Sequence, residues 1–551
     1  MRKKILKLSV SLVILFFCLL FFWLLRFQDD AKIVEAAGVS WYVDNAATGA
    51  NDGASWENAW QSFGAIVWGA GGVDTGDTLY ISGGATSKTY TGERIYVGQS
   101  GITIKVGQTS PHNGVAIINA NHAVDQGIAI ASKNNVTVSG QVGNDPGQHI
   151  KIINAIGSGI DVYGSSNGWN LNYLEIANNG SAVGEVHGLS VGIDGANLTS
   201  AQVHHCVFDN NWTDQIHMMY DKNAPHATQF GRILFHDNII KNTQDDGLEL
   251  GIDSVDIYNN TFGPRGVWTG RTSGHPDHLQ MYGSYYRVYS NTFKDVANPS
   301  DSDGNSFVRW EPYSAVYKDA GHLRIYNNLF YNANAPAGGL PRGIEISAFG
   351  FGADKPTSVT DIVFANNILD KTWFFGLLFN LGTLGTDAVS NIVIENNIFN
   401  DPVVTAGGGS ALWLSRGDGT VTAGNHGSGA DVILDYNIFN ASSAAYKTQI
   451  GYGDLDFNTA DLFRSTTGLD AHGLTADPLF DSNHAPRTGS PAIDGGVSLS
   501  SYFNADYSGA TRPSGLAWDI GAYEYVSAPE PEPEPEIDTT PPSAPTGVSV
   551  N

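Results

Sequence analysis

The sequence predicts an all-β protein built as one solenoid of parallel strands. Pairs of apolar residues, separated by one intervening residue, recur from residue 128 onward at the spacing expected for one solenoid turn. A second series, in which asparagine precedes an apolar pair, alternates with the first. Glycine is abundant, with 65 of 551 residues, and long helical patterns are few. Together these observations favour a turn-rich β protein over a helical or mixed one.

The first 36 residues predict an export signal. Arg2, Lys3 and Lys4 precede an apolar run from Leu8 to Leu25, which is the order of a basic region and a hydrophobic region in such signals. The run is long for a cleaved signal and short for a membrane span, so cleavage and a retained anchor both stay open. We expect an extracellular or cell-surface protein that contacts a membrane only through this segment.

Residues 37–75 are expected to cap the N-terminal end of the solenoid. An uncovered end would expose both the apolar core and a strand edge. The segment predicts a short helix around Glu57–Val67, followed by a strand at Thr78–Ile81.

Residues 76–470 are expected to form the solenoid itself, because their apolar pairs stay in step. Both members of a pair point inward, and the residue between them points outward. Successive pairs are separated by between 27 residues (Leu189 to Ile216) and 36 residues (Val308 to Ile344). The pairs are Ile128/Ile130, Ile160/Val162, Leu189/Val191, Ile216/Met218, Leu248/Leu250, Leu279/Met281, Val308/Trp310, Ile344/Ile346 and Leu377/Phe379.

Asparagine marks one corner of each turn, as in Asn259-Asn260, Asn327-Asn328 and Asn366-Asn367. Asparagine tolerates the left-handed conformation, and its amide can hydrogen-bond to the asparagine of the next turn. The repeats lack paired hairpin turns of the Asn-Gly type, which argues against an antiparallel sandwich or propeller.

With these repeats the chain resembles the right-handed parallel β-helix proteins of the pectin-lyase-like superfamily, from about Trp41 to Tyr525. The resemblance implies the fold and leaves the activity open. Residues 471–526, which include Asp477-Pro478-Leu479-Phe480 and Asp519-Ile520-Gly521, resemble the choice-of-anchor closing segment of exported bacterial β-helix proteins. That resemblance implies surface display.

The last residues predict a spacer and the start of another module. Residues 527–537 form a Pro-Glu linker, which is expected to be extended and solvated. Residues 538–551 resemble the first strand of a fibronectin type III domain.

Composition restricts the partners. The chain carries 55 acidic and 29 basic residues, a net charge of −26, so we expect no nucleic-acid partner. Two cysteines, one of them in the leader, exclude a disulfide framework. We expect a monomer whose partner is a polysaccharide.

Polar residues beside the apolar pairs are expected to form columns on one wall, where we place the function. One column holds Asp214, Asp246 and Asp277. Strands of adjacent turns lie about 4.8 Å apart, so these carboxylates repel one another unless Ca²⁺, a shared proton or a neighbouring cation compensates. We therefore predict these three aspartates as calcium ligands, calcium being the expected cofactor. The structural alternative is that each aspartate caps a turn through the backbone.

Three chemistries fit the wall. In a lyase, His278 or His217 removes the proton beside a uronate carboxylate, and Arg309 with Ca²⁺ neutralises that carboxylate; Asp246 and Glu249 complete the predicted catalytic set. In a glycoside hydrolase, Asp245, Asp246 and Asp277 act as paired acid and base. The segment around Asp245-Asp246 resembles the Asp-rich motif of polygalacturonase-type hydrolases, whose Gly-His-Gly and Arg-Ile-Lys elements are absent here.

In the third chemistry no bond is cleaved, and aromatic residues of the wall stack on sugar rings in a surface adhesin. We favour the lyase because imidazole and basic groups stand among the acids, while the adhesin and the hydrolase stay open. The predicted substrate-binding residues are Gln280, Tyr282, Trp310, Glu311, Arg342 and Glu345.

Overall fold

The computed structural model describes most of the chain from residue 38 to residue 526. The described residues are 38–180, 186–193, 198–220, 229–266, 276–295, 305–312, 319–332, 342–347, 358–372, 375–380, 389–402, 410–415, 423–443, 447–453 and 455–526. The predicted signal, the Pro-Glu linker and the fibronectin-like segment lie outside them.

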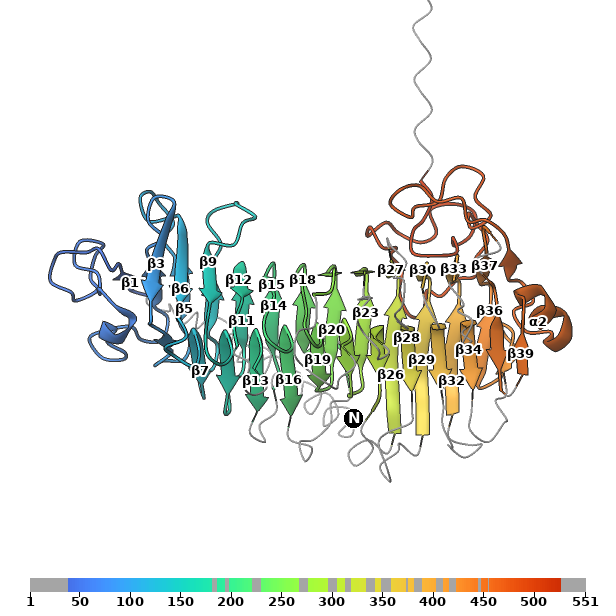
Figure 1. Ribbon diagram of the computed structural model, residues 1–551, viewed down its shortest axis with the longest axis horizontal. Coiled ribbons are helices and arrows are strands. Elements are labelled where there is room, and N and C mark those ends of the chain that lie inside the picture. The colour runs from blue at the N-terminus through green and yellow to red at the C-terminus, as the bar shows by residue number, and fades with distance from the viewer. Residues whose placement is uncertain are drawn as a thin grey trace, which may run out of the picture.

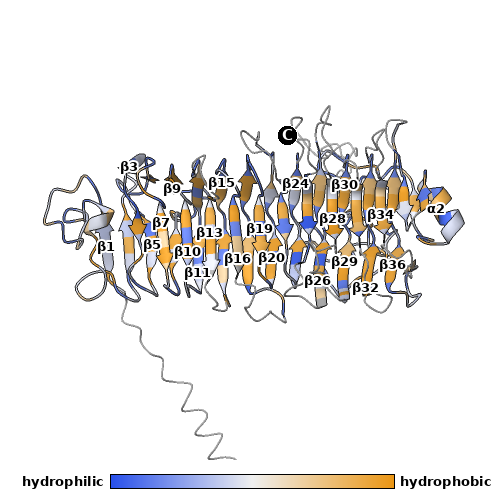
Figure 2. Cartoon of the chain, turned by 60° about the horizontal axis from the view of Figure 1, so that its bottom comes forward, coloured by the Kyte–Doolittle hydropathy of each residue, from blue (hydrophilic) through white to orange (hydrophobic). Residues whose placement is uncertain are grey.

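The described chain is a right-handed parallel β-helix, as the sequence predicts. Its turns stack along the long axis of the molecule (Figure 1), and successive turns add strands to three parallel sheets. Hydrophobic residues dominate these strands, with hydrophilic ones interspersed (Figure 2). Among the described residues, no helix is both long and apolar enough to cross a membrane.

The first sheet has 14 strands. In spatial order they are β1 (Ser40–Val43), β2 (Thr78–Ile81), β5 (Thr103–Val106), β8 (Thr137–Ser139), β11 (Trp169–Asn172), β14 (Ala201–His204), β17 (Ile233–His236), β20 (Val255–Tyr258), β23 (Tyr286–Tyr289), β26 (Asp319–Tyr326), β29 (Ser358–Ala365), β32 (Val389–Glu395), β36 (Val432–Asp435) and β35 (Ala423–Gly424).

The second sheet, which we call the wall sheet, has 13 strands and carries the predicted polar columns. In spatial order they are β4 (Ile95–Tyr96), β7 (Ile128–Ala131), β10 (Ile160–Tyr163), β13 (Leu189–Ile193), β16 (Ile216–Tyr220), β19 (Leu248–Gly251), β22 (Leu279–Met281), β25 (Ser306–Trp310), β28 (Arg342–Ser347), β31 (Phe375–Asn380), β34 (Ser410–Ser415), β38 (Ile450–Tyr452) and β39 (Leu455–Phe457). The last pair, β38 and β39, is antiparallel.

The third sheet also has 13 strands. They are β3 (Ser87–Thr91), β6 (Val115–Asn119), β9 (Ile150–Ile153), β12 (Leu174–Ala177), β15 (Val207–Asp209), β18 (Ile239–Lys241), β21 (Thr261–Phe262), β24 (Thr292–Lys294), β27 (Leu329–Tyr331), β30 (Ile368–Asp370), β33 (Ile398–Asn400), β37 (Ile438–Asn440) and β40 (Leu474–Thr475).

The register of the wall sheet follows the apolar pairs of the sequence. Leu248 is aligned with Leu279, and Leu279 with Val308. These side chains are buried, and further in the core the rings of Phe262 and Phe293 stack with centroids 4.5 Å apart. Because an apolar side chain gains free energy only when it leaves water, each turn depends on its neighbours to complete the core.

An asparagine ladder fixes the corner between the first and third sheets. The backbone N–H of Asn328 donates to Oδ1 of Asn367 at 3.0 Å, and that of Asn367 donates to Oδ1 of Asn397 at 3.1 Å. The same bond repeats from Cys206 through Asn437, where the ladder ends on Oδ1 of Asp470. The ladder thus satisfies buried backbone donors that would otherwise lack partners.

The residue before each ladder position takes the left-handed conformation, with φ of 54° at Asn327, 52° at Asn366 and 57° at Asn396. The sequence predicts that one asparagine provides both the left-handed conformation and the hydrogen bond to the next turn. In the structure, two neighbouring residues share these roles. The amides of Asn366 and Asn396 point away from the ladder and donate to the backbone oxygens of Asp519 and Val497. These bonds hold the closing segment (residues 471–526) against the stack, where Figure 1 shows it beside β27 to β37.

The N-terminal end differs from the prediction. A helix around Glu57–Val67 is wrong, since this stretch contains only the 3-10 turn η1 (Phe63–Ala65). Trp60 forms a parallel bridge with Val43, and its indole stacks on that of Trp41 at 5.3 Å. Because Trp60 pairs with β1, the backbone at Trp60 is extended and not helical. The α-helix α2 (Ala460–Thr467) lies near the other end, capped by Thr459.

Candidate functional site

The candidate site is the outward face of the wall sheet from β13 to β28. The register aligns one outward residue from each strand in a single column. In order they are Ser190, His217, Glu249, Gln280, Arg309 and Glu345. Residues scattered over the sequence are therefore neighbours in space.

The three predicted aspartates lie on successive turns and form a second ladder. Backbone N–H groups of Asp246 and Asp277 donate to Oδ1 of Asp214 and of Asp246, at 3.0 and 2.6 Å. The N–H of Ser306 donates to Oδ1 of Asp277 at 2.5 Å. One oxygen of each aspartate thus caps the next turn, which is the structural alternative that the sequence left open.

The buried carboxylates repel one another. Burial, and then the charges of Asp245, Asp277 and Asp214, raise the pKa of Asp246 well above its ordinary value. Asp214, Asp245 and Asp246 each place a carboxylate oxygen within 4.8 Å of the others. Such an all-oxygen set fits a hard cation such as Ca²⁺, whose charge would relieve the repulsion. Of the three predicted calcium ligands, Asp214 and Asp246 belong to this group, together with Asp245, and calcium binding itself stays a prediction.

Asp277 is not a member of the group Asp214, Asp245 and Asp246, because it is paired with Arg309. Its Nε lies 3.0 Å from Oδ2 of Asp277, its Nη2 lies 3.2 Å from Glu345, and its Nη1 lies 3.5 Å from Glu311. Burial opposes the charge of Arg309, but these three carboxylates raise its pKa above the ordinary value. Arg309 is thus already paired with three acids, and its role in neutralising a substrate carboxylate stays a prediction. Glu311 and Glu345 likewise hold this arginine.

His217 and Glu249 form the accessible part of the column. Nε2 of His217 lies 3.3 Å from Oε2 of Glu249, and the hydroxyl of Tyr282 donates to Oε1 of Glu249 at 3.3 Å. The side chains of His217 and Glu249 are 23% and 22% exposed, whereas those of His187 and Asp214 are 7% and 5% exposed. A molecule on the wall can thus reach this imidazole–carboxylate pair.

His187, which the predicted set did not include, supports this pair from the preceding turn. Its ring stacks on that of His217 with centroids 4.2 Å apart. Its Nδ1 lies 2.9 Å from Oδ2 of Asp214 and 2.8 Å from the hydroxyl of Thr213. The column pattern contained the signal, because His187 stands two residues before an apolar pair, as Asp214 does.

Two predicted residues lie inside the solenoid. His278 is fully buried, its Nε2 is 2.9 Å from the carbonyl oxygen of Lys294, and burial lowers its pKa to about 4. Trp310 is also fully buried, and its indole donates to the carbonyl oxygen of Gly283 at 2.8 Å. Neither side chain can contact a glycan on the surface, so a base at His278 and a sugar platform at Trp310 are wrong.

Other predicted contacts are also restricted. Gln280 is only 2% exposed although it points outward, and Tyr282 is buried with its hydroxyl on Glu249. β28 aligns Arg342 with Ser306, but the side chain of Arg342 lies outside the described part of the chain. An aromatic surface for sugar stacking is therefore not formed by Tyr282 and Trp310.

Comparisons with known proteins place the chain among distant structural neighbours. The crystal structure of pectate lyase Pel9A is 14% identical with a TM-score of 0.40, and covers 89% of this chain and 97% of its own. The lacto-N-biosidase of Eubacterium ramulus is 11% identical with a TM-score of 0.38, and covers 78% and 68%. PfbA, a surface adhesin of Streptococcus pneumoniae, is 11% identical with a TM-score of 0.32, and covers 70% and 78%.

No family model and no curated protein matches the sequence. The architecture is nevertheless unambiguous from the three sheets. The chain is a parallel β-helix protein. Because the structural likenesses are this distant, what this β-helix does has to be inferred from its own wall.

Proposed function

We propose that this β-helix binds a polysaccharide along the wall sheet and cleaves it beside a uronate by elimination. The observation that carries the proposal is the exposure of His217 and Glu249 in a column whose other charged groups are buried. Buried and mutually bonded side chains such as Asp277 and Arg309 keep the wall rigid. This pair and the partly exposed Asp245 are parts of the wall that substrate can touch.

The chemistry assigned to the pair is proton removal. An imidazole is an effective base near neutral pH, and Glu249 orients it while stabilising the imidazolium that forms. His217 takes the proton from the carbon beside the uronate carboxylate, the electron pair forms a carbon–carbon double bond, and the bond to the leaving glycosidic oxygen breaks. That oxygen takes a proton from water as it leaves. Asp214, Asp245 and Asp246 would hold a divalent cation, whose charge would neutralise the substrate carboxylate.

Glycoside hydrolysis is the second candidate, and the raised pKa of Asp246 favours it. A carboxyl whose pKa is raised can act as a general acid, while Asp245 beside it would act as the base. Asp246 is buried, so this chemistry requires substrate to approach through Asp245.

A panel of uronate-containing and neutral glycans distinguishes the candidates. The purified protein is incubated with each glycan, with and without Ca²⁺, and the products are analysed. Ultraviolet absorbance of an unsaturated uronate supports elimination. New reducing ends without that absorbance support the hydrolase, and retention of glycan without either product supports a non-catalytic adhesin.

Calcium is expected to stabilise the protein more above the raised pKa of Asp246 than below it. The raised pKa of Asp246 means that its ionisation destabilises the folded state above that pKa. A bound cation removes this penalty, whereas at lower pH the proton already occupies the site and competes. At a free Ca²⁺ concentration 100 times Kd the gain is about 2.7 kcal/mol, measurable as a rise in Tm.

The variant Asp245→Asn is expected to abolish most of this rise. Asp125→Asn, which changes an exposed acid before β7 of the same sheet, is the matched control. An equal rise in Asp245→Asn and the native protein, or a larger rise at the lower pH, would contradict the calcium assignment.

A further inference from the structure

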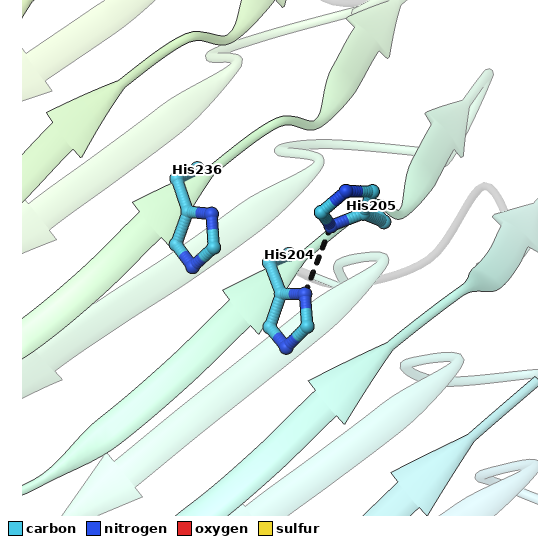
Figure 3. Close-up of side chains that lie close together, drawn as sticks. All are labelled: His204, His205 and His236. Carbon is cyan, nitrogen blue, oxygen red and sulfur yellow. Dashed lines mark hydrogen bonds between the residues drawn. The ribbon is translucent and has the colours of Figure 1, made fainter. Parts of the chain in front are cut away.

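Three histidines gather at a corner of the solenoid away from the wall sheet. His204 ends β14 and His236 ends β17, at aligned positions of neighbouring turns in the first sheet. His205 follows His204 in the left-handed corner position, with φ of 54°. Figure 3 shows the three imidazoles together, and one nitrogen of each lies within 4.8 Å of the others.

Neighbouring rings hold the trio in place. The ring of His236 stacks on that of His204 with centroids 4.8 Å apart and an interplanar angle of 3°. The ring of His205 stacks on Tyr173 at 4.7 Å, while Tyr258 covers the other face of His236 at 4.8 Å. These contacts hold the three rings close together in the absence of a ligand.

Two of the nitrogens point directly at each other. Nδ1 of His204 lies 2.9 Å from Nδ1 of His205. Without a metal, one of these nitrogens must carry a proton and donate it to the other. A metal ion that binds both nitrogens would replace this proton.

The charge of the corner favours a cation. Asp237 places Oδ2 2.7 Å from Nδ1 of His236. A carboxylate beside a ligating histidine fixes the ring and increases its basicity.

We propose that His204, His205 and His236 form a binding site for a divalent transition-metal ion, with Asp237 as the supporting carboxylate. Imidazole nitrogen favours Zn²⁺, Cu²⁺ and Ni²⁺ over Ca²⁺ and Mg²⁺, which prefer oxygen. Bonds from Zn²⁺ to histidine nitrogen are about 2.0–2.1 Å. Because the rings of His204 and His236 stack in parallel, at least one of them has to turn before both nitrogens can face one ion. All three histidines are partly exposed, so their rings can turn.

The wall contains a second group of possible metal ligands, formed by His187, Asp214 and His217, and the test has to separate the two. The chelator-treated protein is titrated with Zn²⁺ by isothermal titration calorimetry. His205→Asn and His236→Gln each remove one ligand from the corner, while His217→Gln removes one from the wall. Asparagine suits position 205, because Asn259 and Asn327 occupy the same corner of later turns with φ near 55°.

The native protein is expected to bind Zn²⁺, and both corner variants are expected to weaken that binding at least about tenfold. His217→Gln is expected to retain it. Electron paramagnetic resonance of bound Cu²⁺ provides a second readout, because the number of coordinated nitrogens falls by one in His236→Gln. No binding by the native protein, undiminished binding by both corner variants, or loss of binding in His217→Gln would each overturn the assignment.

Discussion

Replacing His217 with alanine is expected to lower kcat/KM for glycan cleavage by about 10²- to 10⁴-fold, the range that a positioned general base contributes. The imidazole is the exposed nitrogen base of the wall column, and Glu249 lies 3.3 Å from it. The effect is expected mainly in kcat, since proton removal belongs to the transition state and binding of the glycan to the ground state. Initial rates on the glycan identified by the panel measure both constants.

A matched control is available on another face of the stack. Nδ1 of His322 lies 2.9 Å from Oδ2 of Asp361 in the first sheet, so it is also a partly exposed imidazole–carboxylate pair. His322→Asn is expected to leave kcat/KM unchanged. Equal losses in His217→Ala and His322→Asn would mean that the wall pair acts only through stability, and full activity in His217→Ala would exclude it as the base.

Replacing Arg512 with leucine is expected to destabilise the closing segment by about 3–5 kcal/mol, the usual effect of breaking a buried ion pair. The guanidinium is fully buried, 2.7 Å from Oε1 of Glu524, and it also donates to Oδ1 of Asn327 at 3.0 Å. Its loss leaves a buried carboxylate without its cation and separates the segment from the asparagine corner. Urea unfolding and hydrogen exchange of residues 490–526 measure the change.

The double variant Arg512→Leu/Glu524→Leu is expected to recover part of the stability, because it leaves no uncompensated buried charge. Arg487→Leu is the control, since Arg487 lies exposed in the same segment. If Arg512→Leu behaves as Arg487→Leu does, the ion pair does not hold the segment.

The fold and the wall register could be predicted because both follow from periodicity. Leu248, Leu279 and Val308 repeat one inward position, and their alignment in the structure is the one the sequence gives by counting. Asp214, Asp246 and Asp277 then fall on successive turns. Local patterns contain this information, since every turn repeats the same alternation.

Burial on the outward face could not be predicted in the same way. Gln280 alternates correctly with its apolar neighbours, yet is almost fully buried, because exposure depends on what packs against a residue from distant parts of the chain. His278 did carry a signal that was missed. It stands immediately before an apolar pair, where glycine occurs at Gly247 and Gly343 and phenylalanine at Phe307. Glycine and phenylalanine at the same position of other turns indicate that this position faces the interior, so His278 is expected to be buried there.

The asparagine corner also bears on how such a protein can diversify. From β14 to β37, two residues separate each strand of the first sheet from the strand that follows it in the third, although the length of a whole turn varies between 22 residues (Asn238 to Asn260) and 40 residues (Asn397 to Asn437). The variation in turn length therefore lies at the other bends, while this corner keeps a constant length. In a chain of this design, the loops beside the wall sheet can change in length, and with them the glycan that is bound. The packing of the interior does not have to change.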